Sequence, residues 1–183
     1  MKGTKNTLYL SEKVSLKPKQ LHYIDNEIDK CLSGVARGLN VEYKKPTIVI
    51  ATLEEVSHGN TAVFASYSAA ENILYVANIT ENTGLIRRLQ EGFVASDNEL
   101  STIYHELFHW SDAQEYIAKY GAIVDQREYI RIIQPSFKKK VDALRKRGYN
   151  LDEISKYASD KLREGRYDEV YTEYRVKKLL GGM

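Results

Sequence analysis

The chain is poor in the residues that mark several large classes of protein. Its 183 residues include one cysteine, three prolines and four histidines. Because Cys31 has no second cysteine, neither an intramolecular disulfide nor an all-cysteine metal site can form, and the sequence fits a reducing compartment. The first ten residues lack the apolar run of a signal peptide, and no stretch has the length and apolar character of a transmembrane helix. We therefore expect a cytoplasmic protein without a membrane partner.

Neither sign of charge dominates the composition. Lysine and arginine number 27 and aspartate and glutamate 25, which gives a formal net charge of +2. This balance argues against nucleic acid as a partner, although Lys138–Lys140 and Arg145–Arg147 are locally basic, and we interpret both clusters as a solvated helix face. The hydrophobic fraction of 43% and the charged fraction of 28% are typical of a globular protein. We expect one domain across residues 1–183.

Sheet-forming segments lie in the first half of the chain. A helical pattern of apolar residues from Pro18 to Val35 comes first, and the β-branched run Pro46–Thr52 then predicts a buried strand. Two further strand-like segments, Ala62–Ser68 and Asn72–Asn78, are separated by a short linker. This arrangement predicts an antiparallel hairpin, in which either strand could be outermost.

The pattern of the second half of the chain predicts helices. Ser96 followed by Glu99 has the pattern of a capping box and predicts a helix over Leu100–Tyr120, which Gly121 would end. Two further helices are expected, at Ala122–Arg147 and Asp168–Leu180. The separation of strands from helices predicts an α+β fold, with a helix-and-sheet part over 1–96 and a helical part over 97–183.

The segment YHELFHWSDA, Tyr104–Ala113, carries the strongest chemical signal. His105 and His109 are four residues apart, so on a helix both imidazoles can face a single ion, and zinc accepts such a pair readily. Glu106 projects to one side, where it can take a proton from a water molecule that attacks a carbonyl. This is the H-E-x-x-H signature of zinc peptidases.

A catalytic zinc usually has three protein ligands, so a third ligand must come from elsewhere in the chain. No histidine follows His109. Glu128 is the first acidic candidate, and Glu169 on the last expected helix is the second. Glu169 and Glu173 lie one turn apart, so one could supply a ligand and the other could hold a ligand in place by a hydrogen bond. We favour Glu169 and keep Glu128 as the alternative.

Three segments in order, HELFHWSDA, DEISKYA and DEVYTEYRV, resemble the lethal-factor-like zinc metallopeptidases. These are zincins of the gluzincin type, and they include zincin domains associated with phage minor head proteins. The resemblance implies a zincin-like fold, with zinc bound by His105, His109 and Glu169 and with Glu106 as the general base. It also implies that a tyrosine stabilises the oxyanion of the tetrahedral intermediate.

Two tyrosines and one aspartate complete the set of expected site residues. Tyr157 matches the family pattern within DEISKYA and is favoured as the oxyanion donor, whereas Tyr167 is closer in sequence to Glu169. A phenol near zinc could donate a hydrogen bond to the developing negative charge. Asp112, three residues after His109, could orient a ligand histidine through its second ring nitrogen or could be a surface charge.

These expectations favour a zinc-dependent endopeptidase that acts on a protein or peptide laid along the edge strand of the sheet. One alternative is a zincin-fold binding module with little hydrolytic activity. Another is an aminopeptidase that uses Glu128 as the third ligand. The resemblance further implies a cytoplasmic or virion-associated location and a phage structural protein as a possible partner.

Overall fold

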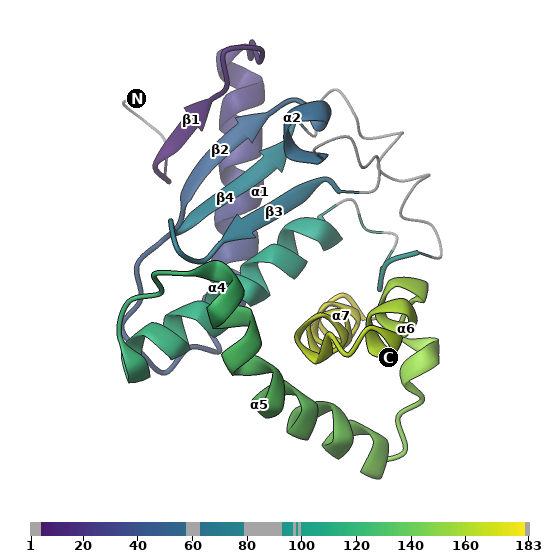
Figure 1. Ribbon diagram of the computed structural model, residues 1–183. Helices are drawn as coiled ribbons and strands as arrows, with labels where there is room; N and C mark the ends of the chain where they lie inside the picture. The colour runs from purple at the N-terminus through teal and green to yellow at the C-terminus, as the bar shows by residue number, and fades with distance from the viewer. Residues whose placement is uncertain (1–4, 58–62, 79–92, 97, 99, 182–183) are drawn as a thin grey trace.

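The structure of the chain is a computed structural model that describes residues 5–57, 63–78, 93–96, 98 and 100–181. It is a mixed α and β fold, in which a small sheet and three helices form one half and three further helices form the other (Figure 1). The elements in chain order are β1 (Leu8–Leu10), α1 (Pro18–Ala36), β2 (Thr47–Ala51), α2 (Leu53–Ser57), β3 (Ala65–Ser68), β4 (Ile73–Ala77), α4 (Ser101–Tyr120), α5 (Gln126–Lys146), the 3₁₀ turn η1 (Leu151–Glu153), α6 (Lys156–Arg163) and α7 (Tyr167–Leu179).

The sheet has four strands in the order β1-β2-β4-β3. β2 is parallel to both β1 and β4, and β3 is antiparallel to β4. The predicted hairpin of β3 and β4 is therefore confirmed, and β3 is its outermost strand. β1 was not predicted, because three residues are too few to show an alternating pattern.

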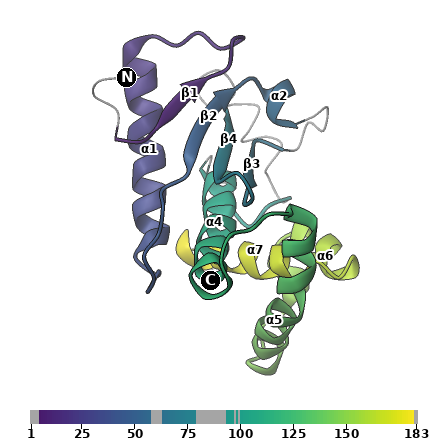
Figure 2. The same ribbon diagram turned by 60° about the vertical axis from the view of Figure 1, so that its left-hand side comes forward.

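The main hydrophobic core lies between the sheet and the helices α1 and α4. Figures 1 and 2 show α1 against one face of the sheet, with α4 running below it beside β3. Ile28 of α1, Ile48 of β2 and Leu74 of β4 are fully buried in this core, as are Leu107 and Trp110 of α4. Because Leu107 and Trp110 take the core side of α4, His105 and His109 are left to a different side of the helix, which faces α7.

The start of α4 differs from the predicted capping box. Its N-cap residue is Leu100, and no side chain caps it. Ser96 instead accepts a hydrogen bond from the backbone N–H of Asn98, whose own side-chain oxygen accepts from the N–H of Leu100. Glu99 lies outside the described residues. The helix itself ends at Tyr120, where Gly121 adopts a positive φ of 92°, as expected.

A second hydrophobic cluster holds the C-terminal helices together. It contains Val141 and Leu144 of α5, Ala158 of α6, and Val170 and Tyr174 of α7. Tyr129, near the start of α5, belongs instead to the main core, so α5 contributes to both clusters. The boundary expected between residues 96 and 97 therefore does not separate the two cores, because α4 packs with the sheet.

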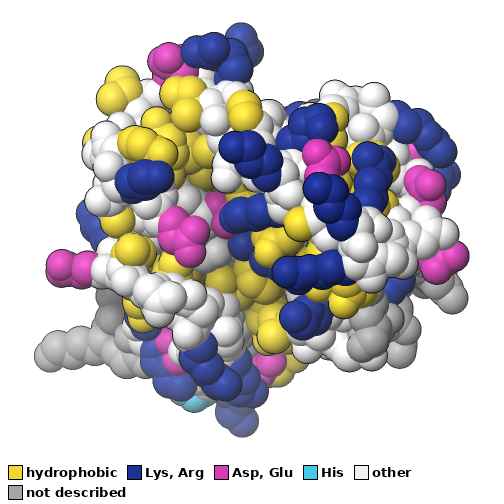
Figure 3. All heavy atoms as spheres, turned by 90° about the horizontal axis from the view of Figure 1, so that it is seen from below, with side chains coloured by type: hydrophobic (Ala, Val, Ile, Leu, Met, Phe, Trp, Pro, Cys, Tyr) yellow, Lys and Arg dark blue, Asp and Glu magenta, His cyan; other side chains and the backbone are white. Residues whose placement is uncertain are grey.

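The outer face of α5 is basic. The helix carries Arg127, Arg131, Lys138, Lys139, Lys140, Arg145 and Lys146 against two acidic residues, Glu128 and Asp142. Seen from below, the molecule presents many lysine and arginine side chains around a hydrophobic area (Figure 3). In the described part of the chain, no helix combines the length and the apolar character that crossing a bilayer requires.

Candidate metal centre

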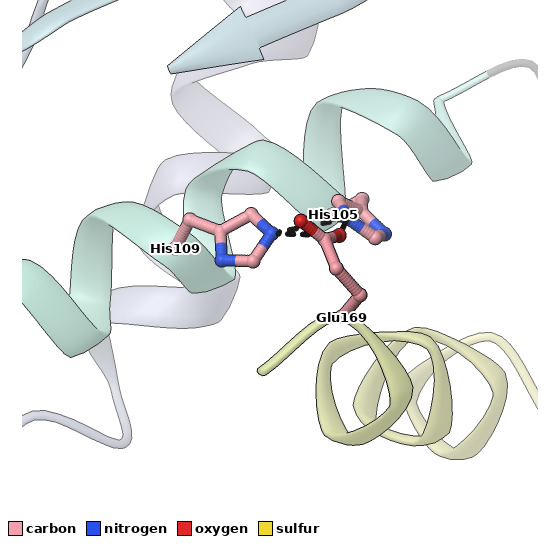
Figure 4. Close-up of side chains that lie close together, drawn as sticks. All are labelled: His105, His109 and Glu169. Atoms are coloured by element: carbon pink, nitrogen blue, oxygen red, sulfur yellow. Dashed lines mark hydrogen bonds and ion pairs between the residues drawn. The ribbon is translucent and has the colours of Figure 1, made fainter. Parts of the chain in front are cut away.

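His105 and His109 bring two imidazole rings together on one side of α4. The rings point toward α7, and their centroids are 4.9 Å apart (Figure 4). The two Nε2 atoms are separated by 3.1 Å. This is the juxtaposition that the four-residue spacing predicts on a helix.

Glu169 of α7 completes a group of three donor residues. Its Oε2 atom lies 2.9 Å from Nε2 of His105 and 3.2 Å from Nε2 of His109. Its other oxygen, Oε1, accepts a hydrogen bond of 2.8 Å from Arg166. The donor atoms of the three residues all lie within 4.8 Å of one another.

The arrangement of the donor atoms fits a tetrahedral zinc ion. Ligand atoms roughly 2.1 Å from such an ion lie about 3.4 Å apart, so the observed separations of 2.9 to 3.2 Å need only a small expansion. Two imidazoles and one carboxylate are also the ligand types that zinc prefers. The two Nε2 atoms face each other at 3.1 Å, and a cation between them would satisfy both lone pairs. His105, His109 and Glu169 form a group that could hold a metal ion.

Glu173 fixes the ring of His105 from the other side. Its Oε1 atom lies 2.7 Å from Nδ1 of His105, so the carboxylate can accept the Nδ1–H hydrogen bond and leave Nε2 facing the donor cluster. Its Oε2 atom accepts from the backbone N–H of Ala95 and from the hydroxyl of Ser155, each at 2.7 Å. The side chain is 2% exposed, and these hydrogen bonds satisfy its buried charge. Glu173 thus holds a candidate ligand, His105, from behind the donor cluster.

Glu106 lies between the donor cluster and the edge strand. Its carboxylate accepts a hydrogen bond of 2.9 Å from the backbone N–H of Tyr67 in β3. The N–H of Ala77 in β4 donates to the carbonyl oxygen of Phe64, so the backbone polar groups of Phe64 point toward β4. Because these groups alternate along a strand, the backbone N–H and C=O of Ala65 and Tyr67 point away from β4. The carboxylate of Glu106 is thus attached to the outward side of the edge strand.

The structure places one of the two candidate tyrosines beside the donor cluster and the other away from it. The Tyr157 hydroxyl donates to Oε2 of Glu169 at 3.2 Å, and its ring centroid is 5.8 Å from that of His105. Tyr167 packs against the second hydrophobic cluster, and its ring lies near Lys138. Tyr157 is therefore the tyrosine that the fold places beside the donor cluster.

Glu128 is not part of the donor cluster. It lies in the first turn of α5, its side chain is 62% exposed, and its nearest ionic partner is Arg131 at 3.5 Å. After Gly121 a short loop leads to α5, which starts at Gln126 and is capped by Asp125. This start directs the side chain of Glu128 into solvent and not toward the histidines. The alternative third ligand is therefore wrong for this structure.

Asp112 does not orient a histidine. Its two carboxylate oxygens accept hydrogen bonds from Arg175 of α7, at 2.9 and 2.5 Å. The guanidinium also lies over the ring of Phe108, 4.5 Å from its centroid. The expected role of Asp112 is thus replaced by a buried ion pair that joins α4 to α7, the two helices that carry the donor residues.

Burial and charge shift the pKa values of the site in opposite directions. Burial alone would raise the pKa of Glu169, but the nearby His109 and His105 hold it well below its usual value. Burial would lower the pKa of His105, but Glu169 and Glu173 outweigh that effect and raise it well above the usual value. The pKa of His109 is raised by Glu169 for the same reason. Glu169 and the two histidines therefore stabilise one another's charged forms.

Glu106 and Tyr157 have pKa values raised mainly by burial. For Glu106 the charges of the two histidines oppose this rise, and the net direction remains upward. For Tyr157 the negative charge of Glu169 adds to the effect of burial, so its hydroxyl stays protonated and able to donate. A carboxylate with a raised pKa and a neutral phenol therefore flank the donor cluster.

A small cavity opens next to these groups. It has a volume of about 80 Å³ and contains His105, Glu106 and Tyr157 in its wall. The apolar part of its lining comes from Val63–Ala65, at the start of β3, and from Phe93 and Val94. The cavity therefore connects the donor cluster with the edge strand.

Three contributors to the site were not predicted from the sequence. They are the backbone N–H of Tyr67, the guanidinium of Arg166 and the hydroxyl of Ser155. Ser155 did carry a signal, because a serine before the helical segment KYASDKLR has the character of an N-cap. The other two depend on tertiary packing and have no local pattern.

Five of the expected site residues thus lie together where α4, α6, α7 and β3 contact one another: His105, Glu106, His109, Tyr157 and Glu169. Comparisons of the chain with protein-family models, with curated proteins and with solved structures found no match.

Proposed function

We propose that the protein is a zinc-dependent endopeptidase of the gluzincin type. The observation that carries the proposal is the group of His105, His109 and Glu169, whose donor atoms lie within 4.8 Å of one another beside the carboxylate of Glu106. An ion held for stability alone needs no base next to it, whereas metal-assisted hydrolysis does. β3 is the last strand of the described sheet, which adds a position where an extended peptide would pair.

The residues have separate tasks in this proposal. Bound zinc supplies Lewis acidity, which polarises the scissile carbonyl and lowers the pKa of the attacking water. Glu106 accepts the proton of that water and passes it to the leaving amine, a task that its position in the cavity wall with His105 favours. Tyr157, a neutral phenol, donates a hydrogen bond to the negative charge that develops on the carbonyl oxygen. Glu173 keeps the ring of His105 in place.

The substrate is an extended segment of a protein or peptide. Pairing with the outward side of β3 at Ala65 would lay the segment across the cavity that Glu106 and His105 line. Tyr67 already donates its N–H to Glu106, so the same strand that would align the substrate also holds the base. An aminopeptidase that uses Glu128 as a ligand is not supported, because that residue is exposed and does not belong to the group of donor residues.

A second candidate is a zincin-fold module that binds a partner without cleaving it. The hydrogen bond from Tyr67 to Glu106 favours it, because a structural role in holding β3 would also explain a buried glutamate at this position. The two candidates differ in what replacement of the carboxylate does to hydrolysis.

The test is cleavage of a peptide library by zinc-loaded protein, followed by mass spectrometry. We expect internal cleavage by the wild type, a loss of about a hundredfold or more in Glu106→Gln, and an unchanged zinc content in that variant. Glu115→Gln is the matched control, because Glu115 is an exposed residue on the same helix. No cleavage by zinc-loaded wild type would refute the peptidase and favour the binding module.

A further inference from the structure

Ser155 makes two hydrogen bonds with one hydroxyl group. As the N-cap of α6, its Oγ accepts from the backbone N–H of Ala158 at 2.9 Å. The same hydroxyl donates to Oε2 of Glu173 at 2.7 Å. The residue is 8% exposed, so water has little access to replace either interaction.

The second of these bonds leads directly to the donor cluster. Glu173 uses its other oxygen for Nδ1 of His105, whose Nε2 is one of the three donor atoms. A carboxylate rotates freely about its last bond unless both oxygens are held. Ser155, together with the backbone N–H of Ala95, holds the oxygen that does not touch the histidine. The hydroxyl therefore limits the orientations that Glu173 can present to His105.

The first bond leads to the other side of the site. Capping fixes the first turn of α6, and Tyr157 is in that turn, two residues after Ser155. The backbone N–H of Tyr157 donates to the carbonyl oxygen of Phe93, and its hydroxyl donates to Glu169. The position of the phenol thus depends on where α6 begins.

We propose that Ser155 is a positioning residue of the metal centre, which acts on His105 through Glu173 and on Tyr157 through the start of α6. This inference rests on the proposed function, because it concerns the same site. It adds a residue that neither touches an ion nor faces the substrate, and whose removal should weaken zinc binding.

A purely structural cap would behave differently. Loss of an N-cap costs about 1 kcal/mol of stability and has no reason to change the affinity for an ion on another helix. Loss of a hydrogen bond that orients a ligand costs about 10- to 100-fold in metal affinity when the lost group touches the ligand directly. Ser155 is one hydrogen bond further away, so we expect a loss of about three- to tenfold.

The experiment measures zinc affinity by chelator competition in Ser155→Ala, with thermal stability recorded in parallel. Ser159→Ala is the matched control, because Ser159 lies on the same helix, is equally buried at 8% exposed, and donates to Asp152 and not to Glu173. Ser155→Thr keeps the hydroxyl and should restore the affinity. The visible spectrum of the cobalt-substituted protein provides a second measure of ligand geometry.

A double substitution further distinguishes a positioning role of Ser155 from a purely structural N-cap. If Ser155 acts through Glu173, the effects of Ser155→Ala and Glu173→Gln on zinc affinity will not add. Equal zinc affinity in Ser155→Ala and Ser159→Ala, or fully additive effects with Glu173→Gln, would overturn the positioning role. Absence of zinc binding by the wild type would instead overturn the proposed function, so the two failures are distinguishable.

Discussion

The ion pair of Asp112 and Arg175 offers a quantitative test of how α4 is held against α7. Asp112 has a side chain 6% exposed, and that of Arg175 is 17% exposed. Removal of one member of a buried pair leaves an uncompensated charge, at a cost of about 3–5 kcal/mol. In Asp112→Ala, Arg175 would keep its hydrogen bond to Thr172 and its contact with the ring of Phe108. We therefore expect the lower end of that range, about 3 kcal/mol.

Urea denaturation and thermal melting would both report this loss. For a chain of this size, about 3 kcal/mol corresponds to a fall in Tm of roughly 6–12 °C. The double variant Asp112→Leu with Arg175→Met removes both charges and should recover most of the stability, because an apolar pair of similar volume needs no desolvation of ions. Asp142→Ala is the control: Asp142 pairs with Lys138 at 2.8 Å on the exposed face of α5, where water and salt screen the pair, so its loss should lower the stability far less.

Two results would contradict this reasoning. The first is a loss in Asp112→Ala no larger than in Asp142→Ala, which would mean that the buried pair is solvated in the folded protein. The second is a double variant as unstable as the single one, which would mean that Asp112 contributes through packing and not through charge. Either would remove the ion pair as an explanation for the alignment of α4 and α7.

Three further predictions concern the donor cluster itself. Glu169→Ala should abolish tight zinc binding in a chelator competition assay, whereas Glu128→Ala should leave it unchanged because that side chain is in solvent; the reverse result would refute the ligand assignment. Zinc affinity should rise with pH, measured by calorimetry in several buffers. Because the pKa values of His105 and His109 are raised, bound protons stabilise the fold below about pH 6.5, and this contribution is lost as the pH rises through the folded pKa values. Zinc must displace the same protons, so it binds more tightly once they have left. A zinc affinity independent of pH would contradict this prediction. Tyr157→Phe should reduce kcat by about tenfold or more with zinc affinity nearly unchanged, and an equal fall in both would assign the phenol to metal binding instead.

Local patterns were sufficient for the parts of the fold that depend on nearby residues. The spacing of His105 and His109 placed both rings on one side of α4, and the spacing of Glu169 and Glu173 placed one at the donor cluster and the other behind His105. The antiparallel hairpin followed from two strand-like runs joined by a short linker. In each case the geometry is set within one or two turns of helix or one pair of strands.

Features that depend on distant segments could not be predicted in this way. The partner of Asp112 is Arg175, 63 residues later, and no property of the sequence around Asp112 indicates it. The order of the strands brings β2 beside β4, which a reading of consecutive segments does not reveal. The helix α6 was missed because its eight residues contain too few apolar positions to show a period. The predicted capping box at the start of α4 was wrong for a different reason, because Ser96 accepts from the backbone N–H of Asn98 and the side chain of Asn98 accepts from that of Leu100.

The donor cluster also bears on the entropy of the unfolded chain. His109 and Glu169 are 60 residues apart in sequence, and the ring belongs to a helix of the main core while the carboxylate belongs to a helix of the second cluster. An ion shared by the two would close a long loop, and chelation of the ion would reopen it. A chain with a single cysteine cannot close such a loop with a covalent bridge of its own. In this protein, coordination would supply the kind of restraint that small secreted domains obtain from disulfides.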